Sequence, residues 1–279
     1  MLRTMFTATN TLSQLQTQLD NISNNISNSN TTGYKTKQAN FSEMLYQQYN
    51  TDKLDKTVRQ SPVGIRYGVG AQISQIQANQ SQGSLQMTDR DLDFALTKEN
   101  QYFNVLMPEG EGTRTAYTRQ GNFYVSPTDN GQVMLVNSDG YAVADSSGQP
   151  IFFPDNATGF TVDANGTLNV NYADGDTLKI ELAITALQKP QAMEQLQGGT
   201  YIGLPGNLQE LGLNEADILT DLQGINRSTV GIQIGALEMS NVDLSKEMTD
   251  LIAAQRSYQF NTRAVSIADQ MLGLINGIR

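Results

Sequence analysis

The side chains whose type and spacing could perform chemistry in this chain are carboxylates. Asp89, Asp91 and Asp93 have the one-three-five spacing with which a calcium loop begins. Such a loop also needs a glycine at its sixth position and a glutamate at its twelfth, and the sequence has neither. Leu92 and Phe94 alternate with the aspartates as strand residues do, so this pattern favours a partly solvated strand end over a metal site.

Residues that the chain lacks limit the remaining chemistry. The 279 residues include no histidine, cysteine or tryptophan. Their absence excludes thiolate nucleophiles, imidazole bases, Ser-His-Asp triads, disulfides and Cys/His zinc sites. Asp174 and Asp176 lie on either side of Gly175, which indicates a turn rather than an acid–base pair. We therefore expect no catalytic residue, no metal and no cofactor.

The net charge and the hydropathy of the chain limit its possible partners and its possible location. The chain has 18 basic and 28 acidic side chains, a net charge of -10, which makes nucleic acid an improbable ligand. It contains no apolar run long enough to cross a membrane and no apolar stretch typical of a secretory signal peptide. We expect a chain that does not insert into membranes and that, if exported, uses a route without a cleaved peptide.

An amphipathic pattern at the N-terminus predicts a helix over residues 1–33. Apolar residues there follow a four-three repeat, which is typical of a coiled-coil seam. Gly33 is the expected stop. The polar side lacks Glu/Lys pairs, so the helix should depend on a partner for its stability. The seam positions are Met1, Met5, Ala8, Leu12, Leu15, Leu19, Ile22 and Ile26.

The C-terminus predicts a second helix within residues 236–279, which Asn241 or Asp243 would cap. Two apolar seams rotated from one another predict two neighbours for this helix. One neighbour should be the N-terminal helix, and the other either the β domain or a second subunit. The main seam positions are Leu244, Met248, Leu251 and Tyr258 in the first seam, and Ile267, Met271 and Leu274 in the second.

The middle of the chain changes to a period of two. Residues 76–235 are predicted to form a β-rich domain of short antiparallel strands, with a hairpin turn at Asn165-Gly166 and one strand running from Leu178 to Ile184. Residues 34–75 are predicted to be an extended arm or loop. The fold class is therefore α+β and multi-domain, with a discontinuous coiled-coil domain made from both termini.

Two terminal stretches and two central ones, "LDFAL" (92–96) and "YTRQGNF" (117–123), resemble the flagellar axial proteins, which are the rod and hook family. We expect Arg119, within the second central stretch, on an outward strand edge. The terminal stretches carry the more specific match. Its main positions are Ser23, Asn24, Asn25, Asn28, Gly33, Tyr34, Lys35, Ser240, Asn241, Val242, Gln255 and Arg256.

In its length, the chain resembles the members of the distal rod group within that family. The resemblance implies a non-enzymatic subunit that polymerises into a hollow helical tube, transmits torque from motor to hook and lets export substrates pass. The implied partners are further copies of the chain, the proximal rod and hook-side axial proteins, and the flagellar type III export apparatus. The implied location is the flagellar basal body. A hook or another axial protein is the alternative within the family.

The resemblance also implies export across the cytoplasmic membrane without a cleaved signal peptide. Rod and hook substrates carry a short Phe-x-x-x-aliphatic element near the N-terminus that the export gate reads. Phe41 and Leu45 have this spacing. Ordinary packing within the arm explains the same two residues equally well.

Other classes of protein stay open from the residues alone. The heptads suit an ordinary antiparallel helix pair in a secreted protein, or a β-rich adhesin or fibre whose helices oligomerise. A carbohydrate-active enzyme on a β scaffold would need two carboxylates, and no pair stands out. Loss of swimming on deletion would separate the axial protein from these alternatives.

Overall fold

The computed structural model describes residues 2–43, 47–49, 65–67, 71–110, 112–128, 131–163, 165–196, 198–206, 208, 212 and 214–277. The chain forms two compact units, each built from separated segments. Helices lie near both termini and antiparallel strands lie between them, which confirms the predicted α+β class. The helical unit comprises Met1–Ser27, Lys37–Gln77 and Asp243–Arg279, and the β unit comprises Asn28–Thr36 and Ala78–Val242.

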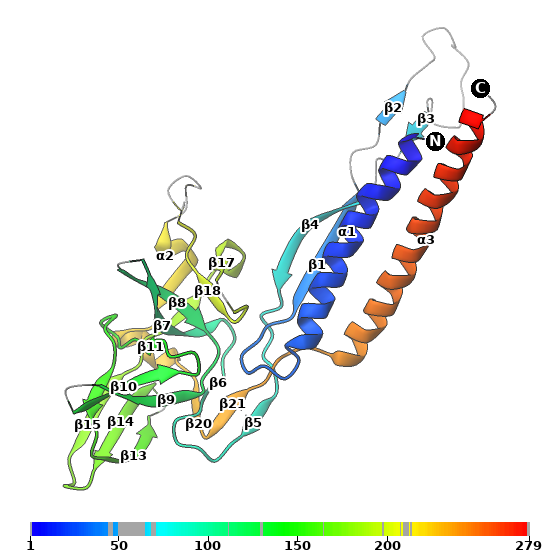
Figure 1. Ribbon diagram of the computed structural model, residues 1–279. Helices are drawn as coiled ribbons and strands as arrows, with labels where there is room; N and C mark the ends of the chain where they lie inside the picture. Colours follow the sequence, from blue (N-terminus) through cyan, green and yellow to red (C-terminus); the bar gives the residue numbers. More distant parts are fainter. Residues whose placement is uncertain are drawn as a thin grey trace. The chain divides into compact units, whose positions relative to one another are not determined.

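Two long helices dominate the helical unit. Helix α1 (Leu2–Ser27) and helix α3 (Leu244–Gly277) lie side by side, with the two ends of the chain at the same end of the pair (Figure 1). The Asp243 carboxylate caps α3 by accepting bonds from the amides of Ser245 at 3.0 Å and Lys246 at 3.2 Å. Among the described residues, no helix is both long and apolar enough to cross a membrane.

Helix α1 ends at Ser27, earlier than the predicted stop at Gly33. The asparagines of this region favour turns over helix, and residues 28–30 form a turn. Gly33 adopts a positive φ of 69° further along, within a segment that belongs to the β unit. The boundary that we expected at residue 33 therefore differs from the one in the structure.

Part of the expected arm is a β-ribbon of the helical unit. Strand β1 (Lys37–Glu43) pairs with β4 (Ala71–Ala78), and the Gln14 side chain of α1 accepts a bond from the Ile73 amide at 3.0 Å. Strands β2 (Gln47–Tyr49) and β3 (Ile65–Tyr67) form a second antiparallel pair. Residues 34–36 of the predicted arm belong to the β unit, and residues 44–46, 50–64 and 68–70 lie outside the described residues.

The β unit contains antiparallel strands joined mostly by tight turns. Its short helices are η1 (Pro190–Ala192), α2 (Glu215–Ile218) and η2 (Gly224–Thr229). Its strands are β5 (Leu85–Met87), β6 (Phe94–Leu96), β7 (Gln101–Glu109), β8 (Gly112–Thr118), β9 (Phe123–Pro127), β10 (Gln132–Asn137), β11 (Ala142–Val143), β12 (Phe152–Pro154), β13 (Ala157–Val162), β14 (Thr167–Tyr172), β15 (Thr177–Glu181), β16 (Ile184–Leu187), β17 (Glu194–Gln195), β18 (Tyr201–Gly203), β19 (Leu219–Asp221), β20 (Ile232–Ile234) and β21 (Ala236–Glu238).

Several pairings in the β unit join strands that are far apart in the chain, and those of β5 and β6 span the greatest distance in sequence. The largest sheet has the order β12-β10-β11-β7-β8-β18-β17, with β9, β16 and β19 attached beside it, and β13-β14-β15 form a separate sheet. The early strands β5 and β6 pair with the late strands β21 and β20 instead. Strands β20 and β21, near the end of the chain, therefore supply the pairing partners of the strands in the region that begins near residue 83.

The hairpin that we predicted at Asn165-Gly166 is present, because β13 pairs with β14 and Gly166 has a φ of 76°. The strand predicted from Leu178 to Ile184 is instead two strands, β15 and β16. The break falls at Leu182, whose amide bonds the Gly166 carbonyl at 3.3 Å. The chain there switches from pairing with β14 to pairing with β7. A continuous period of two does not reveal such a change of partner.

Aromatic rings fill the centre of the β unit. Phe103 and Phe123 meet edge to face with ring centroids 5.2 Å apart, and Phe94 lies 5.6 Å from Phe123. Aliphatic residues of β14 and its neighbours, including Leu168, Val170 and Leu182, are buried in the same core. This core gives rigid support to the loops that carry the polar residues of the next section.

Candidate functional site

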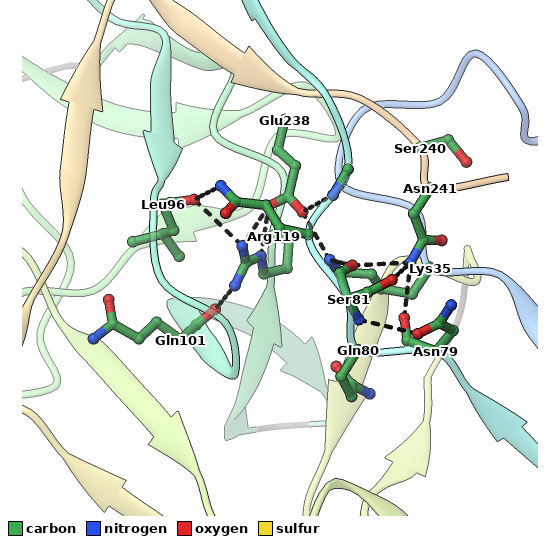
Figure 2. Close-up of polar contacts among 12 residues, drawn as sticks. Lys35, Asn79, Gln80, Ser81, Leu96, Gln101, Arg119, Glu238, Ser240 and Asn241 are labelled. Atoms are coloured by element: carbon green, nitrogen blue, oxygen red, sulfur yellow. Dashed lines mark hydrogen bonds and ion pairs between the residues drawn. The ribbon is translucent and has the colours of Figure 1, made fainter.

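The terminal stretches that resemble the rod and hook family meet inside the β unit. Residues 33–36 follow the N-terminal helix, and residues 238–241 precede the C-terminal helix. Figure 2 shows Glu238 beside Arg119, which follows strand β8, and Lys35 and Asn241 beside Ser81 and Asn79. We call this cluster the junction; it consists of Gly33, Lys35, Thr36, Asn79, Ser81, Gly83, Arg119, Glu238 and Asn241.

The Glu238 carboxylate is the centre of the junction. One oxygen accepts bonds from Lys35 Nζ at 2.7 Å and from the Gly83 amide at 2.9 Å. The other accepts from Arg119 Nε at 2.7 Å and lies 2.5 Å from Arg119 Nη2. Four donors satisfy this buried carboxylate, so removing one of its charged partners should destabilise the fold.

Arg119 is buried, with 2% of its surface exposed, so the expectation of an outward strand edge was wrong. Its guanidinium also donates to the carbonyls of Lys98 at 2.8 Å, Gln101 at 2.9 Å and Leu96 at 3.3 Å. These carbonyls belong to the loop between β6 and β7 and to the strand ends beside it. Arg119 therefore supplies donors to this bend of backbone, where the Leu96 carbonyl also accepts a bond from the Gln82 side chain at 3.0 Å.

Lys35 places a second cation in the same buried cluster. Its ammonium donates to Glu238 and, at 2.8 Å, to the Ser81 carbonyl. Burial, and after it the positive charge of Arg119, lower the pKa of the Lys35 ammonium below its ordinary value. Two cations thus share one carboxylate, and that carboxylate comes from the far end of the chain.

Asn241 links three segments of backbone with one amide group. Its oxygen accepts from both the amide and the hydroxyl of Thr36, each at 2.7 Å. Its nitrogen donates to the carbonyls of Asn79 and Ser81, each at 2.9 Å. Only a side chain that is donor and acceptor at once can make this set of bonds, which explains an asparagine here.

Gly33 is required by both conformation and space. Its φ of 69° is unfavourable for other residues, and its amide donates to the Glu238 carbonyl at 2.8 Å. A side-chain Cβ at this position would lie 2.6 Å from the backbone carbon of Arg119 and from the amide nitrogen of Gln120. The adjacent Tyr34 is fully buried.

A second meeting of the terminal stretches lies in the helical unit. Asn25 of α1 is buried and exchanges two bonds with the backbone of Lys37, at 2.9 and 3.0 Å. Glu247 of α3 accepts a bond from the Asn25 side chain. Burial raises the pKa of the Glu247 carboxyl above its ordinary value, and the bond from Asn25 opposes this.

The other predicted family residues are less central. Asn28 accepts bonds from the Thr31 amide at 3.1 Å and from the Thr31 hydroxyl at 3.2 Å, and so forms a turn after α1. Ser240 accepts a bond from the Val242 amide at 3.3 Å. The exposed members of the set are Ser23, Asn24, Gln255 and Arg256.

The predicted seam of α1 faces inward, whereas most of the predicted seams of α3 do not. Leu15 and Ile22 are buried, and Met5, Leu12, Leu19 and Ile26 are half-buried. On α3 only Leu251 of the predicted seam positions is even half-buried. The exposed positions are Leu244, Met248, Tyr258, Ile267, Met271 and Leu274.

A different line of α3 is covered. Ala254 and Ala268 are buried, and Asn261, Val265 and Leu272 are half-buried between and beyond them. Small side chains allow two helices to approach closely, so a line with modest hydrophobicity faces α1. The prediction from hydrophobicity alone chose the larger side chains, which the single chain leaves uncovered.

The proposed export element is only partly within the described residues. Phe41 in β1 is 42% exposed, and Leu45 lies outside the described residues. The aspartates considered at the start form no metal site in the structure. Asp93 is buried and pairs with Arg90 at 3.1 Å, and no group of acidic side chains in the described ranges could hold a metal ion.

The functional residues that sequence reasoning missed are Arg119 and Glu238. A signal for Arg119 existed, because it stands between buried strand residues in the central family stretch. Glu238 gave no such signal, since its partners are 203 and 119 positions away in the chain. Only the fold brings these charges together.

This arrangement defines a structural subunit: paired terminal helices with uncovered apolar residues, and a β unit in which charged side chains bind backbone and one another. Comparisons with known proteins agree. Residues 5–35 match the family model "Flagella basal body rod protein", residues 98–170 match "Flagellar hook protein FlgE/F/G D1 domain", and residues 233–278 match "Flagellar basal body rod FlgEFG protein C-terminal".

Relatives match over the whole chain. The flagellar hook-basal body complex protein FlhP of Bacillus subtilis is 43% identical over 286 residues, covering 100% of both chains. The flagellar basal-body rod protein FlgG of Caulobacter vibrioides is 34% identical over 287 residues, covering 98% of both chains. FlgG of Borreliella burgdorferi is 30% identical over 293 residues.

The chain belongs to the flagellar rod and hook family of axial proteins. It is a structural subunit of the flagellar basal-body rod, and it is not an enzyme. It assembles there with other axial flagellar proteins. The length that it shares with the FlgG proteins fits a place in the distal rod.

Proposed function

We propose that this subunit polymerises with itself into a hollow helical tube in the distal rod, which transmits torque to the hook and lets export substrates pass. The observation that carries the proposal is the apolar surface of α3. Leu274 is 69% exposed and Ile267 55% exposed on a helix whose other line already packs against α1. Water-exposed side chains of this size are stabilised by burial against another subunit.

The helix pair itself is proposed to pack as a coiled coil. The covered positions of α3 from Glu247 through Leu251, Ala254, Asn261, Val265, Ala268 and Leu272 fall on a four-three repeat with one position, Tyr258, exposed. The α1 seam has the same repeat. Ala254 and Ala268 allow close approach at two of these positions, which supports interlocking side chains between the two helices.

Substitutions on α3 test the assembly. Ile267→Ser and Leu274→Ser should abolish incorporation into rods, since each removes a contact that only a neighbouring subunit can make. The free chain should unfold at unchanged urea concentration, because both side chains are exposed within it. Gln270→Ser, an exposed polar position on the same helix, is the matched control. Normal rods from either apolar variant would refute this role for α3.

Labelling of isolated hook–basal bodies tests the position. An antibody against this chain should label the rod between the basal rings and the hook in electron micrographs. Label on the hook would make the chain a hook-type axial protein. Absence from the particles, with the protein on the cell surface or in the medium, would favour a β-rich adhesin or fibre.

We further propose that the chain leaves the cell through the flagellar type III route without cleavage, with Phe41 and Leu45 as the element that the export gate reads. The exposure of Phe41 on β1 supports this, because its ring contributes little to the folded core. Phe41→Ala should reduce secretion while leaving the unfolding midpoint unchanged. An unchanged secreted amount would show that the ring only packs within the arm.

A further inference from the structure

The junction depends on a segment that is made and exported late. Residues 231–241, here called the closing segment, supply the pairing partners of two early strands: β20 for β6 and β21 for β5. The Thr97 amide donates to the Gly231 carbonyl at 2.9 Å, and the Thr88 amide donates to the Gly235 carbonyl at 2.8 Å. Until the closing segment is present, these early groups have no such partners.

The charges of the junction impose the same dependence more strongly. Lys35 and Arg119 are both buried, and their shared counterion Glu238 lies in the closing segment, 203 and 119 positions away in the chain. A buried cation without a counterion is strongly unfavourable. A chain that lacks residue 238 therefore cannot bury these two side chains as the complete chain does.

Other parts of the β unit have no such requirement. The β13–β14 hairpin closes across a tight turn, with the Asp163 amide bonded to the Thr167 carbonyl at 2.9 Å. Loops of this length close with little entropy loss, whereas pairing over a hundred positions or more is slow. The β unit thus contains a part that can fold early and a part that must wait.

We propose that the closing segment is a folding lock: residues 28–36 and 83–98 stay open until Glu238 arrives as the shared counterion of Lys35 and Arg119. A chain passing N-terminus first through a narrow channel would then keep these segments unfolded until almost all of it had emerged. Only this consequence rests on the export route proposed above. The order of folding is a property of the chain in solution and is measured without export.

Pulsed hydrogen exchange during refolding of the full chain tests the lock. The Asp163 amide should gain protection in an early phase, and the Gly33 and Thr97 amides should gain it together in a later one. Gly33 reports the bond to the Glu238 carbonyl, and Thr97 reports the pairing of β6. Protection of Gly33 or Thr97 in the early phase would overturn the proposal.

Three variants separate the lock from general instability. Glu238→Gln should lower protection of the Gly33 and Thr97 amides by about a hundredfold or more, because two cations lose their counterion. Glu194→Gln, which removes an exposed partner of Arg114, should leave them unchanged. Lys35→Met should keep most of the protection, because one cation then remains for one carboxylate. Equal losses in Lys35→Met and Glu238→Gln, or no loss in Glu238→Gln, would refute the shared-counterion lock.

Discussion

The two units differ in the kind of side chain that lies in an unfavourable environment: the β unit buries charged side chains, and the helical unit exposes apolar ones. In the β unit, charged side chains from three distant parts of the chain are buried, and hydrogen bonds and ion pairs within the chain compensate them. In the helical unit, two alanines of α3 are buried, whereas Ile267, Met271 and Leu274 of the same helix are exposed to water. The β unit is therefore specified by contacts within one chain. We expect the helical unit to depend in part on contacts that a single chain does not make.

The strongest way to break this comparison is to remove the buried guanidinium. Arg119→Leu should lower the free energy of unfolding of the β unit by about 3–5 kcal/mol, because Glu238 loses two of its four donors and three backbone carbonyls each lose one. Arg114→Leu is the matched control, since Arg114 lies on β8 with partly exposed acidic partners, and it should cost less than about 1 kcal/mol. Equal losses in urea unfolding would mean that the junction is not the special region described.

A side chain at Gly33, where the backbone leaves no space for one, should have the next largest effect on stability. Gly33→Ala should destabilise the β unit by about 2–4 kcal/mol, from left-handed strain plus a clash with the Arg119 backbone. Gly110→Ala has a similar φ of 60° with no atom within 4 Å of the added carbon, so it measures strain alone. A Gly33→Ala loss no larger than that of Gly110→Ala would show that the junction tolerates expansion.

Alkaline pH sharpens the comparison, because a buried phenol borders the junction. Burial, the main cause, raises the pKa of Tyr102 to about 12 from 10.0. Between these values the unfolded chain loses the proton and the folded chain keeps it, so stability falls as pH rises. Tyr102→Phe should remove about 2 kcal/mol of that fall. The free energy of unfolding would be measured by urea unfolding from about pH 9 to about pH 11.5. Tyr124→Phe, at an exposed position, is the control, and an identical pH slope in both variants would contradict the prediction.

The smallest effect lies in the helical unit. Burial raises the pKa of the Glu247 carboxyl, so the folded state holds this proton more tightly than the unfolded state does. Stability of the helix pair should therefore decrease as pH rises through the ordinary glutamate range. Glu247→Gln should remove that decrease and slightly raise the melting temperature at pH 7. A lower melting temperature would show that the charged form bonded to Asn25 is the one the fold requires.

Local patterns were enough to predict the helices, the α+β class and the Asn165-Gly166 turn. The period of hydrophobic residues is a property of neighbouring positions, and so is turn chemistry. The same reasoning failed for Arg119, because a positive charge is normally exposed unless a distant counterion covers it. For α3 it left open whether the second neighbour is the β domain or a second subunit, because hydrophobicity says that a side chain needs burial but not whether the same chain or another one buries it.

The family resemblance singled out a set of terminal residues, and the structure gives some of them contacts that explain the residue type. Gly33 avoids a clash, Lys35 pairs with Glu238, and Asn241 links three backbone segments. Their partners are far away in sequence, so spacing alone could not connect them. Gln255 and Arg256 are exposed, and no contact among the described residues explains them.

The order of segments along the chain has a consequence for engineering. The chain passes between the two units four times, after Ser27, Thr36, Gln77 and Val242, so the β unit is an insertion nested inside the helical one. No single cut can release either unit as a continuous fragment. New material can instead be grafted at outward turns of the insertion without moving the termini. The turn at Gly110, where an added carbon would meet nothing within 4 Å, is a natural place for an epitope or a fluorescent tag.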